Sequence, residues 1–251
     1  MVTPTDDPGR KQGGEEFVFA PPTQARRDRI VLSNEEARHL FRVRRVGVGA
    51  IVFATTGSGL VYECAIEANH TLRIVRETSE WGEPPVHLTL CMAMLKGDAN
   101  REVVDIATQL GVRAIYFFRS EHSEGRLLPD KLVKLRLHAI SAIKQCGRAW
   151  LPSINVALSL AEALAMVPIE TTVFVANPLD DEDSKRTMSE LSNSDALIVG
   201  PEGGLTQNEL EVAARRKAIQ LHLGARRLRA ETAVAAGLTY LLNMTGEIKT
   251  N

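Results

Sequence analysis

The feature of this sequence that most restricts its fold is a strand–turn–helix pattern near the C-terminus. Residues 196–199 (Ala-Leu-Ile-Val) predict a buried strand, residues 200–204 (Gly-Pro-Glu-Gly-Gly) predict a turn, and a helix is expected from Thr206. Thr206 and Glu209 match a capping box, in which two side chains satisfy backbone N–H groups at a helix start. Because open α/β sheets bind ligands outside the carboxyl ends of their strands, the pattern predicts a ligand-binding turn.

A second pattern of the same kind follows about twenty residues later. Residues 221–223 end a strand, residues 224–230 form a loop, and an alanine-rich helix runs from Glu231 to Leu242. Glu231 is favourable in a first helical turn in any protein, so it has a structural interpretation as well as a functional one. Arginines between buried elements indicate a phosphate or nucleobase partner, and this loop carries Arg226, Arg227 and Arg229.

The pattern of polar and apolar residues divides the chain into a short tail and two domains. The tail, residues 1–16, is polar, and we expect it to be flexible. Residues 17–80 predict short strands, hairpin turns and one helix from Ser33 to Val43, which together suit a small β-barrel. Residues 81–86 read as a linker. From residue 87 to 251, buried strands alternate with helices, which predicts an α/β domain with a parallel sheet covered on both faces.

Composition narrows the function classes only slightly. The 251 residues are 44% hydrophobic and 24% charged with a net charge of −1, so any affinity for nucleic acid must come from clustered charge. The three cysteines show no CxxC spacing, which argues against a disulfide framework and a zinc site and suits a reducing cytoplasm. No secretory signal or membrane-spanning run is apparent. We therefore expect a cytoplasmic protein that binds no metal. The cysteines are Cys64, Cys91 and Cys146.

The two C-terminal patterns closely resemble those of the 16S rRNA (uracil-N3)-methyltransferase family, a SPOUT-class family. The resemblance rests on residues 200–204, on Leu223-Gly224 and on residues 228–233 (Leu-Arg-Ala-Glu-Thr-Ala), and it extends from Phe17 to Met244. Further agreement comes from His39, Leu40, Val43 and Arg45, from residues 94–98 with 110–112, and from Gln145, Cys146 and Arg148.

Five residues depart from the family pattern. Gln109 replaces a usual Glu, Phe117 a usual Pro and His122 a usual Arg. Lys144 stands where an acid is common, and Arg227 stands where an aliphatic residue is expected.

The resemblance implies a C-terminal trefoil-knot methyltransferase domain preceded by a PUA-like barrel. It also implies a homodimer whose active site is completed across the interface, and S-adenosylmethionine bound in the knot by backbone groups of three loops. The cofactor residues implied in this way are Asn177, Gly200, Pro201, Glu202, Gly203, Gly204, Leu223, Gly224, Leu228 and Thr232.

Uracil N3 carries a proton at neutral pH, so a uracil-N3 methyltransferase must remove that proton or stabilise the anion that forms. Arg229 can stabilise charge on the uracil carbonyl oxygens, and Glu202 or Glu231 can accept the proton. Glu202 has a second interpretation, in which it only orders its own turn. The predicted catalytic residues are therefore Arg229, Glu202 and Glu231.

RNA contacts are expected from basic side chains. Arg38, Arg42 and Arg45 fall at i, i+4 and i+7, which predicts one stripe along the first helix. The long helix ending near Cys146 predicts a second polar face that includes Arg148. Solvation alone explains most charged faces, but two such faces beside a ligand-binding turn favour phosphate contacts. The predicted RNA-binding residues are Arg26, Arg38, His39, Arg42, Arg45, Lys96, Arg148 and Arg226.

The resemblance therefore implies methylation of N3 of a specific uridine in 16S rRNA, within the small ribosomal subunit. Two alternatives stay open: a SPOUT enzyme acting on tRNA or on a ribose 2′-oxygen, and a non-catalytic RNA-binding or ribosome-assembly protein. The sequence has no GxxxxGK[ST], HExxH or GxSxG motif, which argues against nucleotide hydrolysis, zinc peptidase and serine hydrolase chemistry. Cys146 is interpreted as a small core residue rather than a nucleophile.

Overall fold

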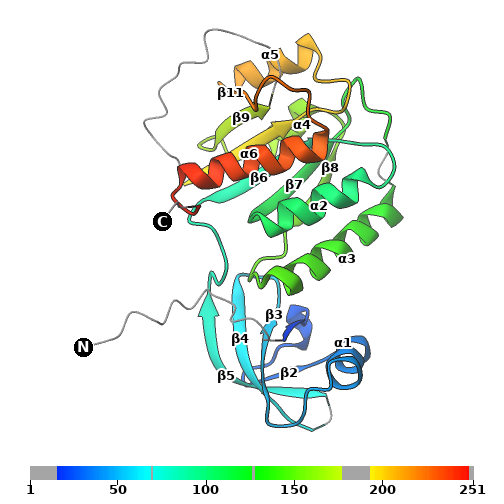
Figure 1. The fold of residues 1–251 in the computed structure, drawn as a ribbon, viewed down its shortest axis with the longest axis vertical. Coiled ribbons are helices and arrows are strands. Elements are labelled where there is room, and N and C mark those ends of the chain that lie inside the picture. Colours follow the sequence, from blue (N-terminus) through cyan, green and yellow to red (C-terminus); the bar gives the residue numbers. More distant parts are fainter. Residues whose placement is uncertain (1–15, 69, 126–127, 177–192, 249–251) are drawn as a thin grey trace, which may run out of the picture. The chain divides into compact units, whose positions relative to one another are not determined.

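A computed structural model describes residues 16–68, 70–125, 128–176 and 193–248. The described residues form two compact units (Figure 1). The first contains the described residues up to Glu83 together with Ile140–Leu151, and the second contains those between Pro84 and Ala139 and those after Leu151. The segment Ile140–Leu151, which the sequence analysis placed with the C-terminal domain, thus packs with the N-terminal unit.

The first unit is built on a mixed five-stranded sheet. Its strand order is β1-β3-β4-β5-β2, with β1 parallel to β3 and the other pairs antiparallel. Its core is apolar, with Ile30, Leu40 and Leu72 fully buried. The strands are β1 (Phe17–Phe19), β2 (Arg29–Val31), β3 (Ile51–Thr55), β4 (Leu60–Ile66) and β5 (Thr71–Ser79), with a short 3-10 helix at Pro22–Gln24.

The first helix is less regular than expected. The Ser33 side chain caps α1 (Asn34–Arg38) by accepting from the backbone N–H of Glu36, as predicted. A π-helical turn, His39–Val43, follows directly. A π turn changes the angular spacing of side chains, and Arg45 lies beyond it at φ 55°. The predicted single stripe of Arg38, Arg42 and Arg45 is therefore wrong, although all three side chains are exposed.

A buried ion pair stabilises the first unit. Arg148 is 2% exposed, and its Nη2 lies 2.6 Å from Oε2 of Glu83. The other carboxylate oxygen of Glu83 accepts from the backbone N–H groups of Ala149 and Trp150, at 3.0 and 2.9 Å. Removing one partner of such a pair costs about 3–5 kcal/mol, because a charge is left buried and unpaired. The predicted RNA contact of Arg148 is therefore wrong, and its role is structural.

The second unit contains a six-stranded sheet in which every pair is parallel. The order is β11-β9-β10-β6-β7-β8, which confirms the α/β parallel-sheet class predicted for this part of the chain. The strands are β6 (His87–Ala93), β7 (Val112–Phe118), β8 (Ser153–Ala157), β9 (Thr172–Ala176), β10 (Ser194–Val199) and β11 (Ile219–Leu221).

Helices cover the sheet. In Figure 1, α2 (Ala99–Gln109) and α6 (Ala230–Met244) lie side by side in front of the strands. Gly237 of α6 packs so closely on β10 that an added Cβ would lie 2.7 Å from Cδ2 of Leu197. The helices α4 (Leu160–Ala165) and α5 (Gln207–Arg215) pack on each other, and α3 (Pro129–Cys146) continues from the second unit into the first. None of the described helices has the length and apolar character needed to cross a membrane.

Parallel strands place all their carboxyl ends at one edge of the sheet. The loops that follow β6, β7, β10 and β11 therefore leave from the same edge. These loops contain residues 94–98, 119–125, 200–206 and 222–229. The sheet thus brings both C-terminal patterns together, while the trefoil knot itself stays a prediction.

Candidate active site

A cavity of about 480 Å3 lies between the loops that follow β10 and β11. Backbone-rich turns and apolar side chains form most of its lining, including Ala176, Leu205 and Ala233. Thr232, predicted as a cofactor residue, is not among the lining residues, and Asn177 lies outside the described residues. The remaining predicted cofactor residues all line this cavity: Gly200, Pro201, Glu202, Gly203, Gly204, Leu223, Gly224 and Leu228.

The first loop, residues 200–206, is held largely by local hydrogen bonds. The predicted capping box is present: the Thr206 hydroxyl accepts from the Glu209 N–H at 3.3 Å, and the Glu209 carboxylate accepts from the Thr206 N–H at 2.8 Å. Gly204 adopts φ +78°, a conformation that favours glycine. A Cβ on Gly200 would lie 3.0 Å from Cγ of Leu205. The sequence Gly-Pro-Glu-Gly-Gly thus allows a turn that is tighter than larger residues permit.

The second loop, residues 222–229, is attached to the first through Arg227. The Arg227 guanidinium donates to the backbone carbonyl oxygen of Glu202. Arg226 is exposed and lines the cavity, whereas Arg229 occupies the N-cap of α6 and makes no side-chain capping bond. The three loop arginines therefore differ in position: Arg226 and Arg227 line the cavity, Arg227 also connects the loops, and Arg229 begins a helix.

The three residues predicted to be catalytic come from two different segments of the chain. Glu202 is exposed and lines the cavity between the two loops. Arg229 and Glu231 are not among the residues that line it, and they lie at the start of α6. Of the three, only Glu202 thus borders the cavity, and the assignment of Arg229 and Glu231 to chemistry stays a prediction.

A neighbouring cavity of about 550 Å3 shares Glu202 and Gly203 with the first. Its other lining residues are Lys96, His122 and Glu124. Nδ1 of His122 lies 3.2 Å from the carbonyl oxygen of Gly204. In sequence, His122 stands out only as a departure from the family pattern. Its position four residues after the end of β7, at the ligand-binding edge of a parallel sheet, was the signal that could have identified it.

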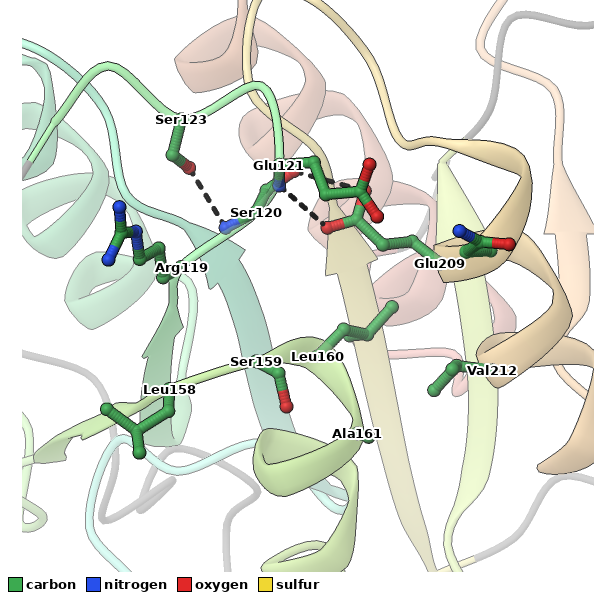
Figure 2. Close-up of a pocket in the computed structure, with 11 residues that line it drawn as sticks. Arg119, Ser120, Glu121, Ser123, Leu158, Ser159, Leu160, Ala161, Glu209 and Val212 are labelled. Carbon is green, nitrogen blue, oxygen red and sulfur yellow. Dashed lines mark hydrogen bonds between the residues drawn. The ribbon is translucent and has the colours of Figure 1, made fainter.

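The loop that carries His122 is held to α5 by a buried carboxylate. Figure 2 shows Glu209 reaching toward Ser120 and Glu121: its oxygens accept from the Ser120 hydroxyl at 3.1 Å and from the Glu121 N–H at 3.3 Å. The third cavity, about 490 Å3, is drawn there and shares no lining residue with the other two. Glu209 thus has two functions, since it also caps α5.

A buried side chain also holds the backbone next to Lys96, at the end of β6. Buried Asn100 accepts from the Leu95 N–H at 3.0 Å and donates to the Leu95 carbonyl oxygen at 2.7 Å. This fixes the peptide directly before Lys96, whose Nζ lies 3.0 Å from Oε2 of Glu124. Sequence reasoning missed Asn100, because its partner groups are backbone atoms and carry no residue signal.

The residues predicted to bind RNA fall into three places. Five lie in the first unit and all are exposed, as basic side chains must be to reach phosphates. Lys96 lines the 550 Å3 cavity and Arg226 lines the 480 Å3 cavity, while Arg148 is buried in its ion pair. The five exposed residues of the first unit are Arg26, Arg38, His39, Arg42 and Arg45.

Cysteine chemistry contributes nothing to this site. Burial raises the pKa of Cys146 to about 11 and that of Cys91 to about 12. Thiols with such values are protonated at neutral pH, and the thiolate is the reactive form. Within the described residues, no group of three or more His, Cys, Asp and Glu side chains is arranged to hold a metal ion. The glycine-rich turns that line the 480 Å3 cavity suit binding and positioning of an organic ligand by backbone groups.

Comparison with family models gives two matches that together span most of the chain. The model described as an RNA methyltransferase domain matches residues 82–242, and the model described as an RNA methyltransferase PUA domain matches residues 32–74. The second match agrees with the PUA-like barrel that the sequence predicted for the first unit.

Similar proteins carry one recurrent name. The chain is 27% identical over 245 residues to ribosomal RNA small subunit methyltransferase E of Synechocystis, covering 93% of this chain and 81% of the relative. A protein of the same name from Mycobacterium bovis is 26% identical over 219 residues, covering 83% and 84%.

Solved structures agree at the level of the fold. A probable rRNA methyltransferase from Porphyromonas gingivalis superposes with a TM-score of 0.77 at 25% identity, covering 93% of this chain and all of that protein. Ribosomal RNA small subunit methyltransferase E from Neisseria gonorrhoeae, solved with S-adenosylmethionine, gives a TM-score of 0.78 at 24% identity, covering 92% and 98%.

Proposed function

Because the chain belongs to the RNA methyltransferase family, we propose that it transfers the methyl group of S-adenosylmethionine to N3 of a specific uridine in small-subunit (16S) ribosomal RNA. The observation that carries this proposal is the 480 Å3 cavity, in which both glycine-rich patterns meet at the carboxyl ends of parallel strands. Its volume lies in the range of about 300–1,000 Å3 that is usual for small-ligand sites. The name shared by the relatives supports the choice of RNA.

Backbone groups of the two loops would hold the cofactor. An added Cβ would meet no atom within 4 Å at Gly204 and only an Arg226 nitrogen at 3.6 Å at Gly224, so both leave the backbone open to close approach. The Arg227 side chain keeps the two loops in contact. When bound, S-adenosylmethionine supplies an electrophilic methyl group on a sulfonium. The chain's main contribution is then positioning, which can supply a large part of a rate enhancement.

The acceptor nitrogen needs a route for its proton. As the new N–CH3 bond forms, the methyl–sulfur bond breaks and the N3 proton leaves for a base or for solvent. Glu202 is the predicted catalytic carboxylate that borders both the 480 and the 550 Å3 cavities. Donors aimed at the uracil carbonyl oxygens would stabilise the anion, and we assign that role to Arg229.

The proposal extends to the partners of the protein. The exposed arginines of the first unit would contact RNA phosphates, in keeping with the PUA model that matches residues 32–74. We assign the protein to the cytoplasm as a homodimer that acts on RNA within the small ribosomal subunit. A substrate of this kind predicts an affinity that falls steeply with salt.

The test is methyl transfer from labelled S-adenosylmethionine to small ribosomal subunits from cells that lack the protein, followed by nucleoside analysis. The expected result is label in 3-methyluridine. Subunits from cells that carry the protein are the matched control, and they should accept no label because their site is already methylated. Label in another nucleoside or in a 2′-O-methylated ribose would contradict the N3 assignment. Absence of label in both samples would contradict methylation of the small subunit.

A further inference from the structure

A methyl acceptor must reach the donor methyl group at close range, so its binding space must open on the cofactor site. Of the two other cavities described above, the one lined by Ser120 and Glu209 shares no residue with the proposed cofactor cavity. The one lined by Lys96 and His122 shares a wall with it, formed by Glu202 and Gly203. Geometry therefore favours the second space for the acceptor.

We propose that the cavity lined by Lys96, His122, Glu124, Glu202 and Gly203, here called the acceptor cavity, receives the uracil base that is methylated, with His122 as the side chain that positions it. This inference rests on the proposed function. It assigns a site for the acceptor base and a role for His122, which stands where the family usually has Arg.

The chemistry of the acceptor cavity matches the edge of uracil. That edge presents a carbonyl acceptor, the N3–H donor and a second carbonyl acceptor. Lys96 supplies a donor, Glu124 and Glu202 supply acceptors, and the His122 ring can act as either. All five lining residues come from three loops at the same sheet edge, so a base bound there would face the cofactor loop.

His122 is held against the cofactor loop itself. A carbonyl oxygen only accepts hydrogen bonds, so the 3.2 Å contact with Gly204 requires the proton to be on Nδ1 of His122. Nε2 is then the ring atom left to contact a ligand. The approach is close: a Cβ on Gly203 would lie 2.9 Å from Cβ of His122. His122 therefore packs directly on Gly203, which is one of the two residues in the wall shared by the cavities.

Hydrogen bonds and close packing also hold the other loops around the acceptor cavity in place. Asn100 clamps the Leu95 peptide, and Gly125 packs so tightly that an added Cβ would lie 2.0 Å from the Leu95 carbonyl oxygen. Glu209 holds the other end of the His122 loop. By contrast, Lys96 and Glu124 form an exposed ion pair: the Lys96 side chain is 77% exposed and the Glu124 side chain 72%. A pair so exposed contributes little to stability, which leaves both side chains available to a ligand.

The experiment separates acceptor binding from cofactor binding. His122→Ala, His122→Arg and the wild-type protein are compared by single-turnover methyl transfer to unmethylated small subunits, and by calorimetric titration with S-adenosylmethionine. His122→Ala is expected to lower the transfer rate about 100-fold, the scale of a misplaced acceptor, with cofactor affinity changed less than threefold. His122→Arg keeps a donor for Gly204 and is expected to recover most of the rate.

The matched control is Asn208→Ala, which alters a residue that lines the third cavity and is expected to leave both quantities unchanged. A His122→Ala protein with wild-type rate and wild-type KM for subunits would overturn the proposal. So would a parallel loss of cofactor affinity, since His122 would then only support the cofactor loop. If the wild-type protein transfers no methyl group, the proposed function fails instead, and that result is distinct from either of these.

Discussion

The two loops that form the proposed cofactor cavity are stabilised in different ways. Residues 200–206 are fixed by their own capping box and by Glu209, which also bonds to the loop after β7. For residues 222–229, the one side-chain hydrogen bond described runs from Arg227 to the carbonyl oxygen of Glu202. The first loop is therefore built by local sequence and one buried carboxylate, and the second depends on the first for its position.

Among the variants that test this difference between the loops, Glu209→Ala is expected to have the largest effect, a loss of stability. Glu209 is 8% exposed and its carboxylate accepts from Thr206, Ser120 and Glu121. A hydrogen bond to a charged group contributes about 1.5–3 kcal/mol and a cap about 1 kcal/mol. Because the three bonds share one carboxylate and do not add, the free energy of unfolding should fall by about 2–4 kcal/mol in urea titrations. Glu211→Ala, on the exposed side of the same helix, is the matched control. Equal losses for the two variants would refute the special role of Glu209.

Gly224→Ala tests whether cofactor binding depends on the backbone conformation of the second loop. Gly224 adopts φ +95°, and the atom nearest to an added Cβ is a guanidinium nitrogen of Arg226 at 3.6 Å, so the strain would be conformational rather than steric. We expect a cost of about 1–2 kcal/mol, seen in calorimetry as a roughly tenfold weaker affinity for S-adenosylmethionine. Gly47→Ala, at an exposed glycine with no atom within 4 Å of the added Cβ, is the control. An unchanged affinity in Gly224→Ala would show that the second loop adapts freely.

Arg227→Leu removes the connection between the loops and introduces the aliphatic character that the family pattern has at this position. The hydrogen bond is exposed, so we expect only about 0.5–1.5 kcal/mol, which is a two- to tenfold weaker affinity for S-adenosylmethionine. The melting temperature should stay nearly unchanged, because the bond lies outside the core. A variant that binds the cofactor as well as the wild type would show that the second loop is positioned without Arg227.

Arg226→Leu should change the affinity for S-adenosylmethionine least. It should separately weaken the binding of RNA. Arg226 is exposed, and no contact with the first loop is described for it. If it contacts a phosphate, its loss should reduce the slope of log affinity against log salt by about 1. Filter-binding assays over a range of salt concentrations measure this slope. A loss of cofactor affinity with an unchanged salt slope would reverse the roles assigned to Arg226 and Arg227.

The same contrast separates what the sequence could predict from what it could not. The Thr206–Glu209 capping box and the glycine-rich turn depend on residues within a few positions of each other, and the structure has them where they were predicted. The alternation of apolar segments likewise predicted the parallel sheet, because strands buried on both faces read as apolar runs.

Two features could not be predicted because they depend on hydrogen-bond partners that are distant in the sequence. Arg148 read as part of a polar helix face, but its partner Glu83 lies 65 residues away and both are buried. Glu209 was predicted as a cap, while its bond to Ser120, 89 residues away, could not be inferred from spacing. The π turn after Arg38 also gave no periodic signal, since five residues are too few to distinguish the side-chain spacing of a π turn from that of an α-helix.

The most direct test of the central claim is nucleoside mass spectrometry of small-subunit RNA from three strains: one that carries the protein, one that lacks it, and one in which the gene is restored. The proposed function predicts that 3-methyluridine is present in the first, absent in the second and present again in the third. A small-subunit RNA that keeps its full content of 3-methyluridine in the strain lacking the protein would contradict uridine-N3 methylation by this chain.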